Sequence, residues 1–263
     1  MIPRLVATDL DGTLVRSDNT VSAYTQAVLA ALDERDVPVV FVTGRPLRWA
    51  EEVFDHVGRH GLAVISNGAL VWDVAGDRPV ALRGIEPHVG LDVAERIRAA
   101  VPGSTFAIET LAGTSLEPDY RERHPVPTGS RRAPIGDLLT EPVLKLMARH
   151  EELGYQEFWD RAAEAVGDLA VITWSSTSAM LEISAAGVSK ATTLAALCDD
   201  LGIAAEDVIA FGDMPNDIEM LRWAGTSYAM ADAHPTVIEV AGHVAPANDE
   251  DGVARVLSVI YGL

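Results

Sequence analysis

The strongest constraint on the fold is a repeated alternation of short apolar runs with amphipathic stretches at both ends of the chain. The run VPVVFVTGR at 37–45 stays apolar almost to its end, as expected of a strand buried on both faces. Before this run, Ser22 can cap the start of a helix that extends to about Arg35. After the run, Pro46 suits the first turn of a helix over 47–57. This alternation predicts an α/β fold with a parallel, doubly wound sheet.

The last quarter of the chain repeats the same pattern. Its apolar runs predict strands, and the amphipathic stretches between them predict helices. The expected helices cover residues 190–201, 215–223, 234–241 and 253–261, and the expected strands cover 208–213 and 227–230.

Residues 83–187 interrupt this alternation with a different pattern. Helical periodicity at 89–100 and 152–166 is mixed with four strand-like runs, TFAIET, VLKLMA, AVITWS and AMLEIS. A long loop rich in Pro, Gly and Arg separates the first two runs. We therefore expect an α+β domain over 83–187, inserted into a discontinuous sheet domain formed by 1–82 and 188–263.

Charge and composition exclude several classes of partner. The net charge of −19 gives a surface that repels nucleic acid and anionic lipid. No apolar run approaches the roughly 20 residues that a membrane span needs. The single cysteine, Cys198, excludes an intramolecular disulfide. We expect a cytoplasmic protein, a monomer or homodimer, with neither a nucleic acid nor a membrane as partner.

Two aspartates follow the first apolar run, in the segment Asp9-Leu10-Asp11-Gly12-Thr13. In an extended chain Asp9 and Asp11 point to the same side, which suits metal binding or a nucleophile paired with an acid/base. At about 4 Å and an effective dielectric near 20 they would repel by about 4 kcal/mol, which a cation would relieve. A polar turn with two solvated carboxylates is the alternative.

Two further segments carry groups that suit phosphate. Thr43 and Gly44 stand at the end of the 37–45 run, where a hydroxyl and backbone N–H groups at a helix start can bind an anion. Lys190 begins an expected helix, where its ammonium can stabilise negative charge on a phosphoryl group. The alternatives are a Thr43 side chain that caps the next helix and a solvated Lys190.

The fourth segment, Gly212-Asp213-Met214-Pro215-Asn216-Asp217, follows the run VIAF directly. It places two carboxylates and an amide at a strand-to-helix turn. Helix capping by Asp213, with Asp217 complementing the helix N-terminus, is the alternative to a ligand-binding role. The carboxyl ends of parallel strands form the edge where such sheets bind ligands, so all four segments are expected at one edge.

In order, spacing and placement, the four segments resemble the haloacid dehalogenase superfamily, most of whose members are phosphotransferases. The chain looks like its Cof-type branch, which has a cap domain inserted between the second and third motifs. The resemblance covers essentially the whole chain. It implies a Rossmann-like core and a cap at 83–187 that selects the substrate.

The resemblance also implies catalytic roles. Asp9 would be the nucleophile that attacks phosphorus. Asp11 would protonate the leaving alcohol and then activate the water that hydrolyses the aspartyl phosphate. Thr43 and Lys190 would hold the phosphoryl oxygens, and Gly44 lies beside them in the substrate-binding loop.

Magnesium is the cofactor that the resemblance implies. Asp9, the backbone carbonyl of Asp11 and Asp213 would bind Mg²⁺, Asp217 would support the site, and Asn216 would orient it or touch phosphate. Four ionised aspartates would carry about four negative charges, which one lysine and a divalent cation largely offset. The metal is therefore expected to be obligatory.

Other residues have two interpretations each. Asn67, in Ser66-Asn67-Gly68, is expected to bind substrate or to serve as a turn residue with positive φ. Arg45 is expected to reach substrate or to form a surface ion pair. A loop expected in the cap carries a cluster of basic residues, for which contact with a polyanionic substrate competes with a solvated loop. The cluster consists of Arg121, Arg123, His124, Arg131 and Arg132.

These features predict a magnesium-dependent phosphatase that hydrolyses a small phosphorylated metabolite, such as a sugar phosphate, through a phospho-aspartyl intermediate on Asp9. Three alternatives remain open. A sugar phosphomutase would share the scaffold but protect the aspartyl phosphate from water. Dehalogenases of the superfamily lack the acid/base that Asp11 would supply. A non-enzymatic phosphometabolite-binding module would have no need of a nucleophile.

Overall fold

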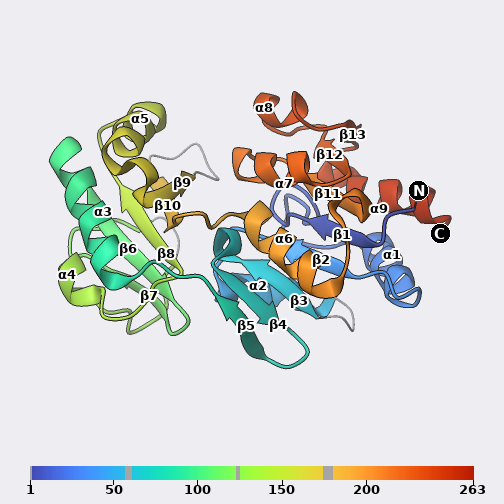
Figure 1. Ribbon diagram of the computed structural model, residues 1–263, viewed down its shortest axis with the longest axis horizontal. Coiled ribbons are helices and arrows are strands. Elements are labelled where there is room, and N and C mark those ends of the chain that lie inside the picture. Colours follow the sequence, from blue (N-terminus) through green and yellow to red (C-terminus); the bar gives the residue numbers. More distant parts are fainter. Residues whose placement is uncertain (1, 57–60, 123–124, 174–179) are drawn as a thin grey trace. The chain divides into compact units, whose positions relative to one another are not determined.

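The computed structural model describes residues 2–56, 61–122, 125–173 and 180–263. The chain forms two compact units (Figure 1). We call Met1–Ala81 with Ser189–Leu263 the core unit, and Leu82–Val188 the cap unit. The predicted fold class, a parallel α/β sheet with an inserted α+β region, is confirmed.

The core unit contains an eight-stranded sheet in the order β13-β12-β11-β1-β2-β3-β4-β5. The strands from β13 to β3 pair in parallel, and β4 pairs with β3 in the antiparallel sense. Every residue of β1, β2 and β11 is buried, as their continuous apolar sequences predict. The strands are β1 (Leu5–Thr8), β2 (Val39–Val42), β3 (Leu62–Ile65), β4 (Leu70–Asp73), β5 (Arg78–Leu82), β11 (Val208–Gly212), β12 (Thr226–Met230) and β13 (His243–Ala245).

Helices α1 and α6 of the core unit begin at the expected signals, whereas α7 begins at Ile218 rather than at 215 and α8 ends at Ile238 rather than at 241. Ser22 accepts a hydrogen bond from the backbone of Thr25 at the start of α1, and Ser189 forms a capping box at the start of α6. Gly202, at φ 64°, ends α6. The helices are α1 (Ala23–Asp33), α2 (Leu47–Ala50), α6 (Lys190–Leu201), α7 (Ile218–Trp223), α8 (Pro235–Ile238) and α9 (Gly252–Tyr261).

The helix expected over 47–57 is shorter than predicted. Helix α2 ends at Ala50, and the chain continues as a tighter 3₁₀ turn over Glu51–His56, while residue 57 lies outside the described part. Only Ala50 and Val53 are buried here. So narrow an apolar contact gives a continuous α-helix little tertiary support.

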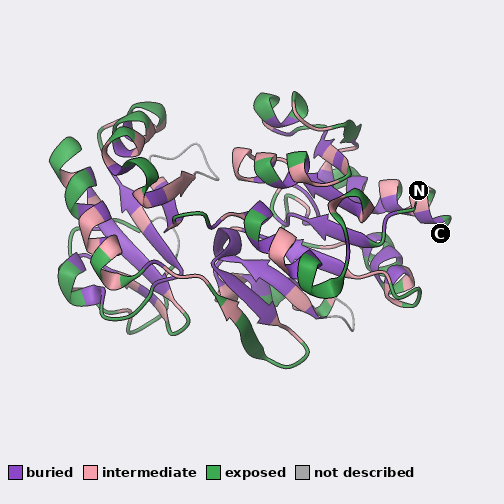
Figure 2. Ribbon diagram, viewed as in Figure 1, coloured by how far each residue is buried: buried purple, intermediate pink, exposed green. Residues whose placement is uncertain are grey.

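The cap unit has an antiparallel five-stranded sheet in the order β7-β6-β8-β10-β9. Figure 2 shows its strands as largely buried beside half-exposed helices. Helices α3 and α5 pack their apolar residues against one face of the sheet, where Phe106, Leu146, Phe158 and Ile183 form the centre of the core. The elements are α3 (Pro87–Ala100), β6 (Thr105–Thr110), β7 (Gly113–Leu116), α4 (Ile135–Leu138), β8 (Lys145–Arg149), α5 (Tyr155–Val166), β9 (Ala170–Thr173) and β10 (Met180–Ala185).

The strand runs AVITWS and AMLEIS extend into 174–179, which lies outside the described residues. Across the described ranges, every helix is too short or too polar to cross a bilayer.

Candidate active site

The predicted residues meet at the carboxyl edge of the core sheet. Asp9 follows β1, Thr43 follows β2 and Asp213 follows β11. Strand β1 lies between the other two in parallel register, and Asp9 donates its backbone N–H to the carbonyl oxygen of Phe211 at 3.1 Å. The fold thereby brings three segments that are far apart in sequence to one edge, as the strand pattern predicts.

Lys190 links two of the aspartates. It is the first residue of α6, and its Nζ lies 2.6 Å from Oδ1 of Asp9 and 2.7 Å from Oδ1 of Asp217. The Lys190 side chain is 2% exposed and that of Asp217 is 0% exposed. The solvated lysine considered from the sequence is therefore wrong.

The turn after β11 is held by its own side chains. Oδ2 of Asp217 accepts backbone N–H groups from Asp213 and Met214, both at 3.1 Å. Oδ1 of Asp213 accepts the hydroxyl of Thr13 at 2.9 Å. Asp217, rather than Asp213, thus anchors this turn, while Asp213 faces the segment that contains Asp9.

Thr13 and Gly12 are contributors that sequence reasoning missed. Thr13 is buried and touches Asp213 directly. Gly12 has φ +73°, and a Cβ there would lie 2.4 Å from Oδ2 of Asp213, so a side chain would displace that carboxylate. The sequence signal that could have indicated these two residues is their position immediately after Asp11.

The carboxylates of Asp9, Asp213 and Asp217 form an acid cluster, in which each offers an oxygen within 4.8 Å of the others. Burial raises the pKa of Asp9 well above its ordinary value, although the Lys190 charge opposes this. Burial, with the neighbouring Asp217 charge, raises the pKa of Asp213 to about 7. For Lys190, burial would lower the pKa, but Asp217 and Asp9 outweigh it and the pKa is raised.

This acid cluster fits a divalent cation. Three carboxylates are clustered beside one ammonium group, which contacts two of them, so this largely buried site has an excess of negative charge. Carboxylate oxygens are the ligands that hard cations such as Mg²⁺ take in proteins. Both oxygens of Asp217 are already engaged by Lys190 and the backbone, so Asp9 and Asp213 are the better-placed ligands.

Asp11 lies outside this cluster. Its side chain is 59% exposed, and it accepts two hydrogen bonds from Arg45, at 2.9 Å from Nε and 2.6 Å from Nη2. Arg45 also donates to the carbonyl oxygen of Trp49 at 3.0 Å. Of the two interpretations of Arg45, the structure contains the ion pair. Its partner is the predicted acid/base.

The remaining site residues surround Thr43. Its hydroxyl oxygen accepts the backbone N–H of Arg45 at 3.0 Å within the loop, whereas α2 begins after Pro46 with no side-chain cap, so Thr43 does not cap that helix. Nearby, Asn216 donates its side-chain amide to Oδ1 of Asn67 at 3.1 Å. Asn67 has φ 55°, the positive value expected of a turn residue. A Cβ on Gly44 would lie 2.9 Å from that same Asn67 oxygen, so glycine allows the close approach.

The basic loop of the cap unit is partly neutralised within itself. Arg132 forms an ion pair with Glu122 at 2.7 Å and donates to the carbonyl oxygens of residues 117, 118 and 120. Arg121 and Arg131 are exposed. Two members of the predicted cluster, Arg123 and His124, lie outside the described residues.

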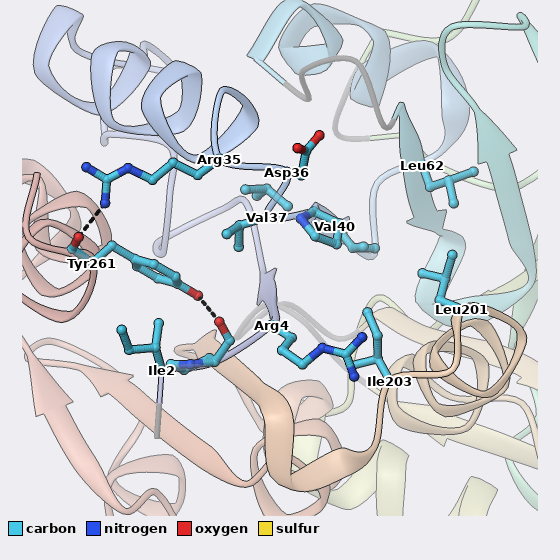
Figure 3. Close-up of a pocket in the computed structure, with 13 residues that line it drawn as sticks. Ile2, Arg4, Arg35, Asp36, Val37, Val40, Leu62, Leu201, Ile203 and Tyr261 are labelled. Atoms are coloured by element: carbon cyan, nitrogen blue, oxygen red, sulfur yellow. Dashed lines mark hydrogen bonds between the residues drawn. The ribbon is translucent and has the colours of Figure 1, made fainter.

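A cavity of about 650 Å³ lies at the opposite edge of the core sheet (Figure 3). Its wall is closed by Tyr261, whose hydroxyl donates to the carbonyl oxygen of Pro3 at 2.9 Å and whose carbonyl oxygen accepts from Arg35 at 2.5 Å. The remaining lining residues come from the starts of β1, β2 and β3 and from the end of α6. This hollow is thus separate from the acid cluster at the carboxyl edge.

Comparison with known proteins identifies related sequences and folds. A family model described as haloacid dehalogenase-like hydrolase matches residues 6–257. A 5-amino-6-(5-phospho-D-ribitylamino)uracil phosphatase of Bacillus subtilis is 28% identical over 99% of this chain and 98% of its own length. An HMP-PP phosphatase of an Enterobacter species is 29% identical over 92% of this chain and 89% of its own.

Solved structures share the fold across both units. A protein of Streptococcus mutans superposes with a TM-score of 0.87 at 25% identity, covering 99% of this chain and 100% of that one. A subclass IIB sugar phosphatase of the same superfamily, BT4131, superposes with a TM-score of 0.83 at 20% identity, covering 98% of this chain and 99% of that one. The second likeness bears on the fold alone.

Proposed function

This chain belongs to the haloacid dehalogenase-like hydrolase family, and from that premise we propose that it is a magnesium-dependent phosphatase with Asp9 as nucleophile. It is a phosphoric monoester hydrolase, as its phosphatase relatives are. The proposal adds the metal, the covalent phospho-aspartyl intermediate and the roles of individual residues. The observation that carries it is the buried Asp9 carboxylate at a strand end, held by Lys190 beside Asp213.

The first half of the reaction transfers the phosphoryl group to Asp9. A carboxylate oxygen of Asp9 forms a bond to phosphorus as the ester P–O bond breaks, and Asp11 gives a proton to the departing alkoxide. Burial works against the ionised nucleophile, so Lys190 and a bound cation must keep Asp9 charged. Thr43, Gly44, Asn216 and the backbone around them are proposed to hold the phosphoryl oxygens.

The second half releases phosphate. A water molecule attacks phosphorus, Asp11 takes its proton, and the bond between phosphorus and the Asp9 oxygen breaks to give inorganic phosphate. Arg45, which binds both oxygens of Asp11, can hold this carboxylate in place for proton transfer. Mg²⁺ bound by Asp9 and Asp213, and by the predicted backbone carbonyl of Asp11, would supply positive charge to the phosphoryl oxygens.

The substrate is proposed to be a small phosphorylated metabolite, a sugar phosphate or similar phosphomonoester. The relatives carry names that include a phosphorylated ribitylaminouracil and phosphoglycolate, compounds with very different leaving groups. Such variety supports a phosphate site common to the family, with the leaving group selected elsewhere. We assign that selection to the cap unit, Leu82–Val188.

The test is phosphate release from a panel of phosphorylated metabolites with magnesium, with chelator, and with the Asp9→Asn variant. We expect magnesium-dependent turnover that Asp9→Asn lowers by at least about a thousandfold. Asp18→Asn is the matched control, because Asp18 is an exposed aspartate in the turn that bonds Thr20. Turnover that persists in chelator, or in Asp9→Asn, would contradict the proposal.

A further inference from the structure

The segment Ser66–Gly68, directly after β3, has an uncommon backbone. Its three residues have φ values of 52°, 55° and 105°, although two of them carry side chains that disfavour this region. Ser66 is 0% exposed and Asn67 is 2% exposed. A buried turn of this kind persists only where its surroundings hold it, and such strain concentrates at functional sites.

One side of the turn holds the loop after β2. Ser66 donates its N–H to the carbonyl oxygen of Arg45 at 3.1 Å, and Asn67 donates its N–H to that of Thr43 at 3.0 Å. The side-chain oxygen of Asn67 lies over Gly44, where a Cβ would approach it to 2.9 Å. The position of the Thr43–Arg45 backbone is therefore set by this turn.

The other side holds two more segments of the site. Oδ1 of Asn67 accepts the amide of Asn216 at 3.1 Å, 149 residues away in sequence. The carbonyl oxygen of Gly68 accepts the hydroxyl of Thr193 at 2.8 Å. A Cβ on Gly68 would lie 2.4 Å from the carbonyl oxygen of Ser189, the residue that precedes Lys190, so the turn packs closely against the start of α6.

We propose that the Ser66–Gly68 turn is a positioning element that fixes three phosphate-binding segments relative to one another. Asn67 is then a positioning residue that joins the Thr43–Arg45 loop to Asn216. Because its side-chain oxygen already accepts from Asn216, we assign Asn67 this positioning role in place of the substrate contact expected from the sequence. This inference rests on the proposed phosphatase function.

The first test is Asn67→Gly, which removes the amide but keeps a residue suited to positive φ. Small displacements of a phosphate site can cost on the order of a hundredfold in rate. We expect kcat to fall by about 10- to 100-fold, with KM changed by less than about threefold. The loss should be the same factor for substrates with different leaving groups, because phosphate, not the leaving group, is being held.

Asn19→Gly is the matched control. Asn19 also has a positive φ, 63°, but lies in an exposed turn. It should leave kcat and KM unchanged. A KM increase in Asn67→Gly that varies with the leaving group would instead make Asn67 a substrate contact. An unchanged kcat would leave it a purely structural residue, and either result would overturn the inference.

Coupling to Asn216 is tested with Asn216→Ala alone and combined with Asn67→Gly. If the two side chains act as one unit, the double variant should lose no more kcat than the worse single variant. Losses that multiply in full would show independent action and would contradict the inference.

Wild type, Asn67→Gly, Asn216→Ala and the double variant also separate a failure of this inference from a failure of the proposed function. The Tm values of the ligand-free proteins are measured in parallel, because the Asn67–Asn216 contact is present without substrate. We expect each single variant to lower Tm by about 2–4 °C and the double variant to fall short of the sum. Absence of wild-type turnover would defeat the proposed function alone, whereas fully additive Tm losses would defeat the Asn67 coupling.

Discussion

The chain contains two lysines, and both are buried in surroundings that differ sharply. Lys190, in the core unit, contacts Asp9 and Asp217, with Asp213 beside them. Lys145, in the cap unit, pairs with Glu182 at 2.8 Å. Two buried glutamates on that sheet, Glu109 and Glu182, are matched by two buried bases, Lys145 and Arg149. Glu117, buried directly after β7, pairs with Arg98 at 2.7 Å.

The charge balance around the two lysines distinguishes a ligand-binding site at Lys190 from a structural ion pair at Lys145. A buried pair of opposite charges is internally compensated and needs nothing further. The acid cluster instead holds three carboxylates against one ammonium, and burial, reinforced by the neighbouring carboxylates, raises the pKa of Asp9 and of Asp213. An uncompensated charge in a folded protein is a feature of sites that bind an additional ion.

Replacing Lys190 should have the largest effect. Lys190→Met leaves the three clustered carboxylates, of which Asp9 and Asp217 are buried, without this cation, so we expect kcat to fall by at least about a thousandfold. The metal-free variant should also lose stability, and Mg²⁺ should restore more of its Tm than it adds to wild type. Thermal unfolding with and without Mg²⁺, beside steady-state kinetics, measures both; a Tm insensitive to the metal would break the comparison.

Lys145→Met is the matched substitution in the cap unit. It leaves Glu182 buried without this partner, so we expect destabilisation of about 3–5 kcal/mol. The double variant Lys145→Met with Glu182→Leu should recover most of that loss, and Mg²⁺ should have no special effect. Urea unfolding measures the free energies; a double variant as unstable as the single one would contradict a self-contained pair.

Asp213→Asn should stabilise the metal-free protein. The folded-state pKa of Asp213 is raised from 3.8 to about 7, so the folded state binds the proton more tightly than the unfolded state. Wild type therefore loses stability as pH rises from 3.8 towards about 7. At pH 8 the variant should be more stable by about 1–3 kcal/mol, with the gap narrowing as the pH falls below 7 and closing near pH 3.8. A gap independent of pH would contradict the assigned titration.

Arg45→Gln should have the smallest effect on folding. The Arg45 side chain is 11% exposed, but its partner Asp11 is 59% exposed, and a pair that water reaches from one side contributes about 1 kcal/mol or less. We expect a change in unfolding free energy below about 1 kcal/mol. Urea unfolding of Arg45→Gln against wild type checks this, and a loss comparable with that of Lys145→Met would show that the two regions do not differ as described.

The fold was predictable where burial is two-sided. The run at 37–45 and the run ending at Asp213 are continuously apolar, and they became the buried strands β2 and β11. Strands β4 and β5 were not predicted. Four of the five residues of β5 are exposed, so it carries no apolar pattern.

The site was predictable to the extent that strand ends define it. Parallel strands bring Asp9, Thr43 and Asp213 to one edge whatever their side chains do. The partners of individual side chains were not predictable. Asn67 and Asn216 are 149 residues apart, and Arg45 and Asp11 are 34 apart, so no local periodicity reports either contact.

The most direct test of the phosphatase account is to detect the phosphoryl group on Asp9. Asp11→Asn should slow hydrolysis of the intermediate, because it removes the base that activates water, while an aryl phosphate substrate, whose leaving group needs no proton from Asp11, keeps the first step fast. Rapid quenching of this variant with substrate and Mg²⁺, followed by peptide mass spectrometry, should show phosphate on Asp9 and not on Asp18 or Asp213. Turnover without any phosphorylated Asp9 would contradict the central claim.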